Sequence, residues 1–186
     1  MKIALTGSSS TGKSTLAATL LANDEFKRFA NRLLHVDGRR MLASMGCQSM
    51  DKMSREQLKQ YQLAYYAKKK EIEAFQSDYI TDRSYVDIAA YWIIRDSYDM
   101  PEAERDILLH SCRTEAKKYD LTVHLPFGLL EFEPDGYRPE DTALNKEIDH
   151  QIKILLTDWN IVHLTINTTS LSERVEIVLS ALKGIK

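Results

Sequence analysis

The feature that most constrains this chain is the octapeptide Gly7-Ser-Ser-Ser-Thr-Gly12-Lys13-Ser14. It follows a short apolar run at residues 2–6 and precedes a segment rich in helix-forming residues that extends to about Asn23. A Gly-x-x-x-x-Gly-Lys-Ser pattern between a strand and a helix is typical of a main chain that curls around a polyphosphate. The octapeptide therefore predicts a buried strand, a tight turn and a helix, in that order.

The residues of this turn are the expected ligands of a nucleoside triphosphate. Several main-chain N–H groups must point inward, and glycine lets the chain approach phosphates without a side-chain clash. The helix N-terminus adds partial positive charge. We expect Lys13 to reach the β- and γ-phosphates, Ser14 to bind Mg²⁺ and Thr15 to contact the α-phosphate of ATP. The expected nucleotide-binding residues are Ser8, Ser9, Ser10, Thr11, Gly12, Lys13, Ser14 and Thr15.

The rest of the chain alternates between predicted strands and helices. Serine is followed three residues later by Gln or Glu at Ser54 and at Ser170, which marks two helix starts. Strands are predicted at 33–37, 78–82, 121–125 and 161–165, and helices at 39–45, 55–75, 85–97, 101–118, 142–156 and 171–184. This alternation predicts an α/β fold with a parallel sheet covered on both faces. No linker divides the chain, so one domain is expected over residues 1–186.

Two acidic residues, Asp37 and Asp82, end the second and third predicted strands. Ligands collect at the carboxyl ends of such strands, so both side chains are expected to face the phosphate loop. Asp82 is suited to hold Mg²⁺, and Arg83 to neutralise the transferred phosphoryl group. Asp37 is the preferred candidate for the base that takes the proton of the acceptor hydroxyl. The structural alternatives are a helix N-cap for Asp37 and an ion pair for Arg83.

Residues 126–141 contain prolines and glycines, lack helical periodicity and are predicted to form a lid-like loop. Folded over the nucleotide, such a loop would exclude water and bring Arg138 onto the phosphates. The alternative is a solvated turn in which Arg138 pairs with a neighbouring carboxylate. The segment at Asn167 is placed to contact adenine, and a plain strand–helix connection is the alternative.

Four segments resemble the P-loop nucleoside and nucleotide kinases, especially the group that includes ribosylnicotinamide kinase domains and phage-encoded small kinases. They are GSSSTGKST at 7–15, HVDGRR at 35–40, TDRSYVDIAAY at 81–91 and DGYR at 135–138. The resemblance implies a three-layer fold with a five-stranded parallel sheet in the order 2-3-1-4-5. It also implies that Asp82 and Arg83 work beside Mg²⁺ and that Arg138 is a lid arginine. Asp37 stands where many relatives have glutamate.

The acceptor of the phosphoryl group stays open. Five basic residues favour an acceptor that carries phosphate if they border its site, and a solvated helix face is the alternative. Three tyrosines at helical spacing can stack on a base or belong to the core. The basic residues are Lys27, Arg28, Arg32, Arg39 and Arg40, and the tyrosines are Tyr61, Tyr65 and Tyr66.

Three hypotheses of function follow: a kinase for a nucleoside or nucleotide, a kinase for DNA or RNA at a terminal hydroxyl or a hydroxymethylated base, and a nucleotide-switched binding protein. The net charge of −2 argues against a general nucleic-acid coat protein. Cys47 and Cys112 are too few for a disulfide framework, and no segment approaches a membrane span, so a cytoplasmic protein is expected. The oligomeric state stays open, with a homodimer as one alternative.

Overall fold

A computed structural model describes residues 1–97, 100–132 and 141–185. Five parallel strands form one sheet in the order β2-β3-β1-β4-β5, which confirms the order that the resemblance implied. The strands are β1 (Lys2–Thr6), β2 (Arg32–Leu34), β3 (Tyr79–Asp82), β4 (Leu121–His124) and β5 (His163–Thr165). Because β1 is central, the loop that follows it emerges in the middle of the carboxyl edge of the sheet.

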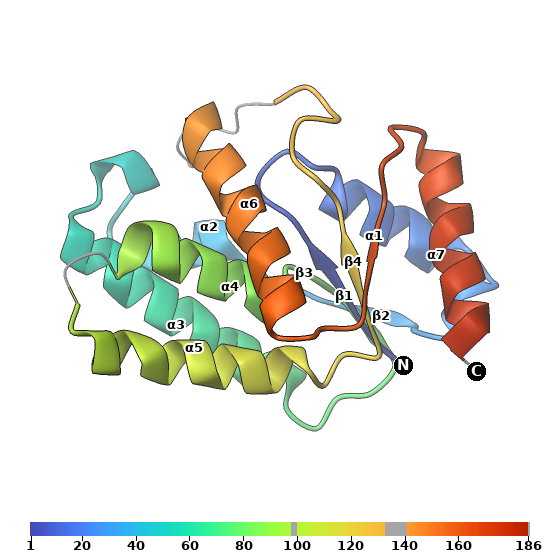
Figure 1. The fold of residues 1–186 in the computed structure, drawn as a ribbon, viewed down its shortest axis with the longest axis horizontal. Coiled ribbons are helices and arrows are strands. Elements are labelled where there is room, and N and C mark those ends of the chain that lie inside the picture. Colours follow the sequence, from blue (N-terminus) through green and yellow to red (C-terminus); the bar gives the residue numbers. More distant parts are fainter. Residues whose placement is uncertain (98–99, 133–140, 186) are drawn as a thin grey trace.

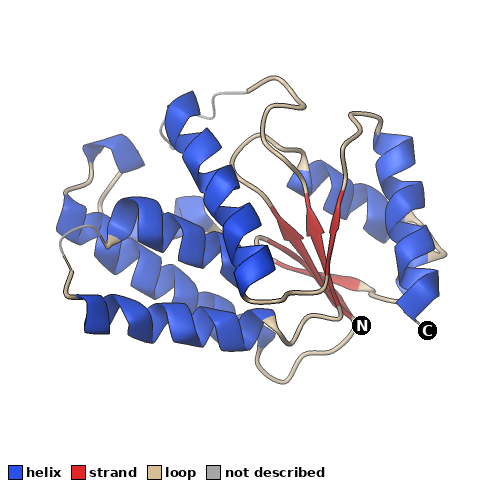
Figure 2. Cartoon of the chain, in the orientation of Figure 1, coloured by secondary structure: helices blue, strands red, loops and turns tan. Residues whose placement is uncertain are grey.

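Helices cover both faces of the sheet (Figure 1). The first and last helices lie on one face, while the third to sixth lie on the other (Figures 1 and 2). The helices are α1 (Lys13–Ala22), α2 (Gly38–Ser44), α3 (Arg55–Glu73), α4 (Tyr85–Tyr91), α5 (Glu102–Ala116), α6 (Thr142–Asp158) and α7 (Leu171–Ile185). Two short 3₁₀ turns, η1 (Phe26–Arg28) and η2 (Met50–Lys52), and one π-helical segment, η3 (Trp92–Asp96), complete the described elements.

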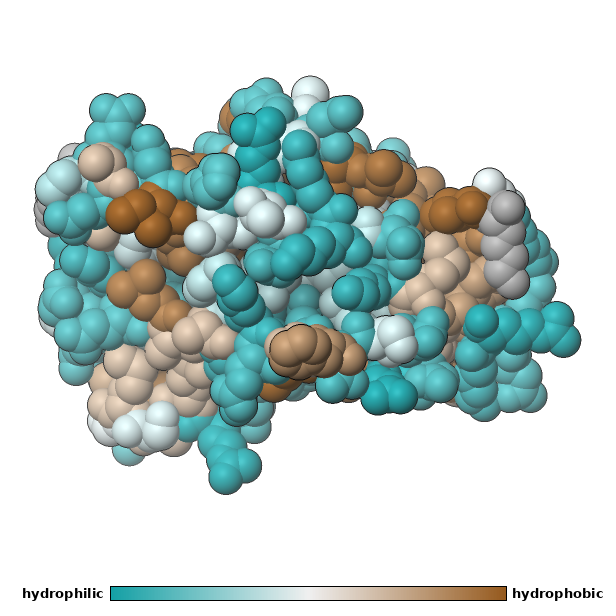
Figure 3. Space-filling model, turned by 90° about the horizontal axis from the view of Figure 1, so that it is seen from below, coloured by the Kyte–Doolittle hydropathy of each residue, from teal (hydrophilic) through white to brown (hydrophobic). Residues whose placement is uncertain are grey.

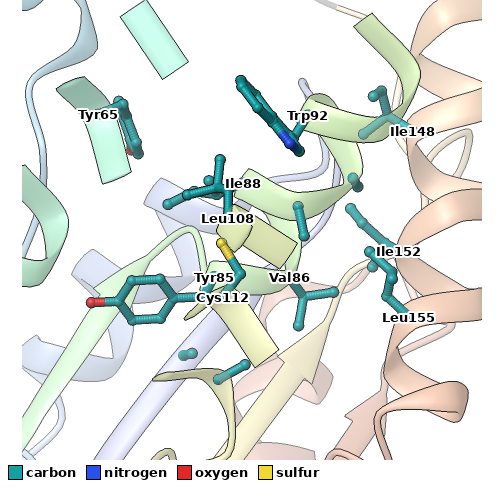
Figure 4. Close-up of a cluster of buried hydrophobic side chains, with 14 of the residues drawn as sticks. Tyr65, Tyr85, Val86, Ile88, Trp92, Leu108, Cys112, Ile148, Ile152 and Leu155 are labelled. Carbon is teal, nitrogen blue, oxygen red and sulfur yellow. The ribbon is translucent and has the colours of Figure 1, made fainter. Parts of the chain in front are cut away.

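The apolar core has two parts, one on each face of the sheet. The larger part lies beneath α3 to α6, and Figure 4 shows side chains of α4 such as Val86 and Ile88 among those of α5 and α6. The smaller part joins Leu16 of α1 and Val178 of α7 to Ile3 of β1. Helix α4 is buried along nearly its whole length, so the site residues near its N-terminus rest on a rigid element.

Three local predictions differ from the structure. Strand β2 ends at Leu34, opposite Thr81 of β3, rather than at Asp37, which instead is the N-cap of α2. The helix predicted over 85–97 is α-helical only to Tyr91 and continues as η3. At the start of α7 the Ser170 hydroxyl accepts a hydrogen bond from the Glu173 main-chain N–H at 3.4 Å, but the Glu173 carboxylate contacts the Thr168 hydroxyl instead of completing a capping box.

The face seen from below in Figure 3 is mostly hydrophilic, with apolar patches between the polar residues. Large exposed apolar side chains include Phe75, which is fully exposed, together with Ile107 and Val162. None of the described helices combines the length and the apolar character that a membrane span requires. Both cysteines, Cys47 and Cys112, are free thiols.

Candidate functional site

The loop between β1 and α1 has a backbone that only glycine can supply at two positions. Gly7 has φ 149°, and a Cβ there would lie 2.4 Å from the carbonyl oxygen of Leu125. Gly12 has φ 83° and is the N-cap of α1. The two glycines therefore let the chain turn tightly out of the sheet and enter the helix with its main-chain N–H groups gathered on the inside of the loop.

The side chain of Lys13 lies within this loop and is almost fully buried. Its Nζ donates to the main-chain oxygen of Ser8 at 2.5 Å and contacts the hydroxyl of Thr11 at 3.1 Å. Burial, and after it the nearby guanidinium of Arg83, lowers the pKa of Lys13 to about 8. The ammonium is thus held close to the main chain of the loop, and a bound anion would stabilise its charged form.

Ser14 and Asp82 form a pair of oxygen ligands at the mouth of the loop. The Ser14 hydroxyl donates to Asp82 Oδ2 at 2.5 Å. Burial by itself would raise the pKa of Asp82, but the Lys13 ammonium, the Ser14 hydrogen bond and Arg83 together lower it. No cluster of three metal-binding side chains occurs within residues 1–97, 100–132 and 141–185. A hydroxyl beside an ionised carboxylate fits Mg²⁺, which takes one or two protein oxygens and completes its shell with phosphates and water.

Asp87 is a site residue that the sequence analysis missed. Its carboxylate accepts hydrogen bonds from the Thr6 hydroxyl at 2.7 Å and the Gly7 N–H at 3.0 Å. It also accepts from the N–H and the hydroxyl of Ser84, at 2.7 and 2.8 Å. Asp87 therefore ties the start of the phosphate loop to the start of α4. The available signal was the spacing of Ser84 and Asp87, which form a capping box in the structure.

Replacing Asp87 with Asn should destabilise the fold. The variant puts an amide where four donors converge on one buried carboxylate, so we expect the free energy of unfolding to fall by about 2–4 kcal/mol. Urea unfolding measures the change. The control is Asp106→Asn on the exposed surface of α5, where a change within about 0.5 kcal/mol is expected. Equal stability of the two variants would contradict the anchoring role of Asp87.

Arg83 follows β3 in the left-handed conformation, with φ 75°. Its guanidinium carbon lies 5.1 Å from the centre of the Tyr91 ring. Burial alone would lower the pKa of Arg83, but Tyr91, Tyr65 and the nearby carboxylates raise it well above the usual value. A permanently charged guanidinium is therefore fixed beside Asp82 and Lys13, and its role toward the transferred phosphoryl group remains a prediction.

One cavity of about 440 Å³ brings the predicted groups together. The phosphate loop forms one side of it, and Asp37, Asp82 and Arg83 line it as well. Helix α3 and the segment α4–η3 form further walls. The lining of the cavity also includes Met50, Tyr61, Gln62, Tyr65, Ile88, Tyr91 and Arg95. Arg138 and the DGYR segment at 135–138 lie outside the described residues, so the lid remains a prediction.

Asp37 is a helix N-cap, which was one of the two alternatives, and it also lines the cavity. It is exposed and is the N-cap of α2, where Oδ1 accepts the main-chain N–H of Arg40 at 3.0 Å. It also lines the cavity that holds Asp82 and the phosphate loop. A capping carboxylate has a second oxygen, so the structural role does not exclude a role in proton transfer.

The basic residues do not form one surface. Lys27 pairs with Asp24, and Arg32 donates to Gln76, near the amino end of the sheet. Of the five, Arg39 is the one that lines the cavity within the described part of the chain. The tyrosines divide too: Tyr61 and Tyr65 are buried and line the cavity. Tyr66 instead meets the ring of Tyr85, with 5.9 Å between the centroids.

A second anchor of the loop, Arg174 of α7, was also missed. Its Nη1 donates to the main-chain oxygen of Thr11 at 2.9 Å, and its Nε donates to that of Thr168 at 2.7 Å. The buried guanidinium thus joins the phosphate loop to the connection between β5 and α7. That connection contains Asn167, whose predicted contact with adenine remains a prediction.

Comparison with known proteins identifies the family. The sequence pattern of the AAA domain family matches residues 2–174. The chain belongs to the AAA domain family. No curated protein matches this AAA domain by sequence.

Solved structures of other proteins, two of them kinases, share the fold of this chain. Deoxyadenosine kinase from M. mycoides, bound to dCMP and dCDP, has a TM-score of 0.71 and 12% identity, with 99% of this AAA domain and 100% of that chain covered. NadR in complex with NR has a TM-score of 0.67 and 14% identity, with 99% of this AAA domain and 50% of the NadR chain covered. Thymidylate kinase from Ehrlichia chaffeensis has a TM-score of 0.61 and 13% identity, with 98% of each chain covered. The AAA domain thus spans half of the NadR chain and nearly all of the two kinases.

Proposed function

We propose that this AAA domain is an ATP- and Mg²⁺-dependent kinase that transfers the γ-phosphate to a hydroxyl or phosphate of a nucleoside or nucleotide. The observation that carries the proposal is the shared cavity, which is lined by the phosphate loop and by Asp37, Asp82 and Arg83. A nucleotide-binding loop alone would also suit a switch. Carboxylates and a guanidinium in the same cavity as the loop are what transfer to a second substrate needs.

Each residue of the cavity has a distinct role in this proposal. Lys13 and the main-chain N–H groups of the loop bind the β- and γ-phosphates. Ser14 and Asp82 hold Mg²⁺, which neutralises phosphate charge when bound. Arg83 stabilises the charge of the phosphoryl group in transit, and Asp37 orients the acceptor hydroxyl and takes its proton. The named structural neighbours support the acceptor class, because they are nucleoside and nucleotide kinases.

A phosphate-transfer screen tests the proposal. The protein is incubated with Mg²⁺ and ATP labelled in the γ-phosphate, together with nucleosides, nucleoside monophosphates, and modified and unmodified DNA. Label on a small molecule is the expected result. Label on polymer, with a steep dependence on salt, would indicate a nucleic-acid kinase instead. Slow hydrolysis that no acceptor accelerates would indicate a switch and overturn the proposal.

The affinity for ATP should fall as pH rises above about 8, the pKa of Lys13 in the free protein. A bound triphosphate favours the protonated amine and raises its pKa. The binding energy from this charge is therefore fully present below pH 8 and is lost above it, by up to about tenfold in Kd per pH unit.

Calorimetric titration of a non-hydrolysable MgATP analogue between pH 7 and 9.5 checks this dependence. The control is Lys13→Arg, whose side chain stays charged throughout this range. Its binding should be weaker and nearly independent of pH. The Lys13→Arg variant retains Tyr91. Burial would raise the pKa of Tyr91, but Arg83 and a hydrogen bond with Ser9 lower it. Any dependence of Kd on pH that remains in the variant therefore comes from Tyr91 or another group, and not from Lys13. Equal slopes in both proteins would contradict the prediction.

A further inference from the structure

Arg95 is a charged side chain of the cavity that has no part in the proposed transfer of phosphate. It belongs to η3, the π-helical segment that continues α4. The segment is closed at Ser97, whose N–H and hydroxyl both donate to the main-chain oxygen of Trp92, at 3.0 and 2.7 Å. A π-helical turn inside a helix redirects side chains and is frequent at functional sites. Here it carries Arg95 to the cavity wall.

The guanidinium of Arg95 is held firmly on two sides. Asp96 accepts from Nε at 2.5 Å and from Nη2 at 3.0 Å, so the two groups pair through both carboxylate oxygens. The side chain of Asp96 is completely buried, while that of Arg95 is 12% exposed. The guanidinium carbon also lies 5.0 Å from the centre of the Tyr91 ring. Asp96 and Tyr91 thus fix the plane of the guanidinium, and the third nitrogen takes no part in the pair with Asp96.

That third nitrogen, Nη1, has a weak partner. It lies 3.6 Å from the sulfur of Met50, and a thioether is a poor hydrogen-bond acceptor. Met50 itself lines the cavity. An oxygen or a ring nitrogen of a ligand would make a stronger bond to the same N–H group without disturbing the pair with Asp96.

The surroundings favour a flat, uncharged ligand edge over a phosphate. Asp96 neutralises Arg95, whereas Lys13 and Arg83 supply positive charge near the phosphate loop. The neighbouring walls are the side chains of Met50, Tyr61, Tyr65 and Ile88, which are buried and largely apolar. Such walls suit the faces of an aromatic heterocycle, and the edge of the heterocycle needs a fixed donor.

Gln62 adds a second fixed polar group to this wall. Its Nε2 donates to the main-chain oxygen of Ile88 at 2.8 Å, and the side chain is 4% exposed. The amide therefore cannot rotate freely. A site with fixed polar groups discriminates strongly between ring edges, because the wrong edge leaves a buried group unpaired.

We propose that Arg95 is a specificity-determining residue that reads the nucleobase of the acceptor. Its Nη1 donates to a ring nitrogen or a carbonyl oxygen at the edge of the base, and Asp96 is the positioning residue that fixes the guanidinium. The inference rests on the proposed function and narrows the acceptor to a compound with a nucleobase, bound with its base between η2, α3 and η3.

The test compares the best acceptor from the transfer screen with analogues in which one ring nitrogen or one carbonyl of the base is replaced by a C–H group. The main variant is the double substitution Arg95→Met with Asp96→Asn, which removes both charges together and leaves no unpaired buried charge. The control is Arg105→Met with Asp106→Asn, an adjacent Arg–Asp pair on α5 that does not line the cavity. Arg95→Lys is a second variant, which keeps the charge but loses the planar fork.

We expect kcat/KM for the best acceptor to fall about 10- to 100-fold in the double variant, with the Kd for MgADP unchanged. With the wild-type protein, kcat/KM for one of the base analogues should be lower than for the best acceptor by a similar factor. With the double variant, kcat/KM for that analogue should fall no further. Arg95→Lys should lose base preference while its unfolding stays close to that of the wild type. The Arg105–Asp106 control should match the wild type throughout.

Two failures are distinguishable. If the wild-type protein phosphorylates an acceptor and the double variant keeps the same base preference, the inference about Arg95 is overturned and the proposed function stands. An equal loss on every acceptor, with base preference unchanged, also overturns it, because it indicates a general structural effect. If the wild-type protein phosphorylates no member of the panel, the proposed function fails and the inference fails with it.

Discussion

Asp82→Asn is expected to lower kcat about a thousandfold while the fold stays intact. The carboxylate lies 2.5 Å from the Ser14 hydroxyl, and Lys13, Ser14 and Arg83 keep it ionised at neutral pH against the effect of burial. Asparagine can still accept the hydrogen bond from Ser14, so the local structure survives. It cannot supply the negative charge that, in the proposed function, holds Mg²⁺ beside the γ-phosphate.

The dependence of the rate on Mg²⁺ separates this role from a structural one. We expect the Mg²⁺ concentration for half-maximal rate to rise at least about tenfold in Asp82→Asn. Ser14→Ala should raise it as well, and the two effects should be far from additive, because both residues would hold one ion. Asp120→Asn is the matched control, since Asp120 accepts the main-chain N–H of Lys2 at 2.7 Å on the opposite edge of the sheet. An unchanged Mg²⁺ dependence in Asp82→Asn would refute the assignment.

The sequence was sufficient for the fold because its local and global signals agree. The strand, glycine turn and helix around the phosphate loop were predicted within one or two residues, as was the capping box that starts α3 at Arg55. The order of the strands did not follow from periodicity. It came from the resemblance, because pairing in a parallel sheet is set by crossovers that no local pattern records.

The errors and omissions share one physical cause, which is tertiary contact. The strand boundary at Leu34 depends on pairing with β3, and the anchoring roles of Asp87 and Arg174 depend on contacts with the phosphate loop. A lone Asp after Ser84 or an Arg in the last helix carries no local signal of such a partner.

Charge patterns on helices are equally ambiguous. Lys69 and Glu73 belong to the sequence Lys-Lys-Lys-Glu-Ile-Glu, which is typical of a solvated helix face. Both are buried in the structure, where Lys69 Nζ lies 2.5 Å from Glu73 Oε1 and donates to the Thr81 hydroxyl at 2.8 Å. The Tyr119 hydroxyl adds a hydrogen bond to Glu73 at 3.0 Å. Burial of this pair follows from the contacts of α3 with Thr81 of β3 and with Tyr119, which the helix alone does not specify.

Asp37→Asn is expected to lower kcat about 100- to 10,000-fold with almost no change in the Kd for MgADP. Asp37 lines the cavity together with the phosphate loop, and in the proposed function it orients the acceptor hydroxyl and takes its proton. The substitution is well suited to the question, because Asn is as good an N-cap as Asp. The bond from the Arg40 N–H to the side-chain oxygen, and with it the start of α2, should persist.

The matched control is Asp141→Asn. Asp141 is the N-cap of α6, where its carboxylate accepts the N–H groups of Ala143 and Leu144 at 2.8 and 3.1 Å, and it does not line the cavity. Both variants exchange an N-cap aspartate for asparagine, so a structural effect would appear in both and a chemical effect in Asp37→Asn alone. If the two variants turn over equally fast, Asp37 is a helix cap and no more. Proton transfer would then fall to Asp82, the carboxylate that accepts the hydrogen bond of Ser14, because an acceptor hydroxyl attacking the γ-phosphate must still lose its proton to a nearby base.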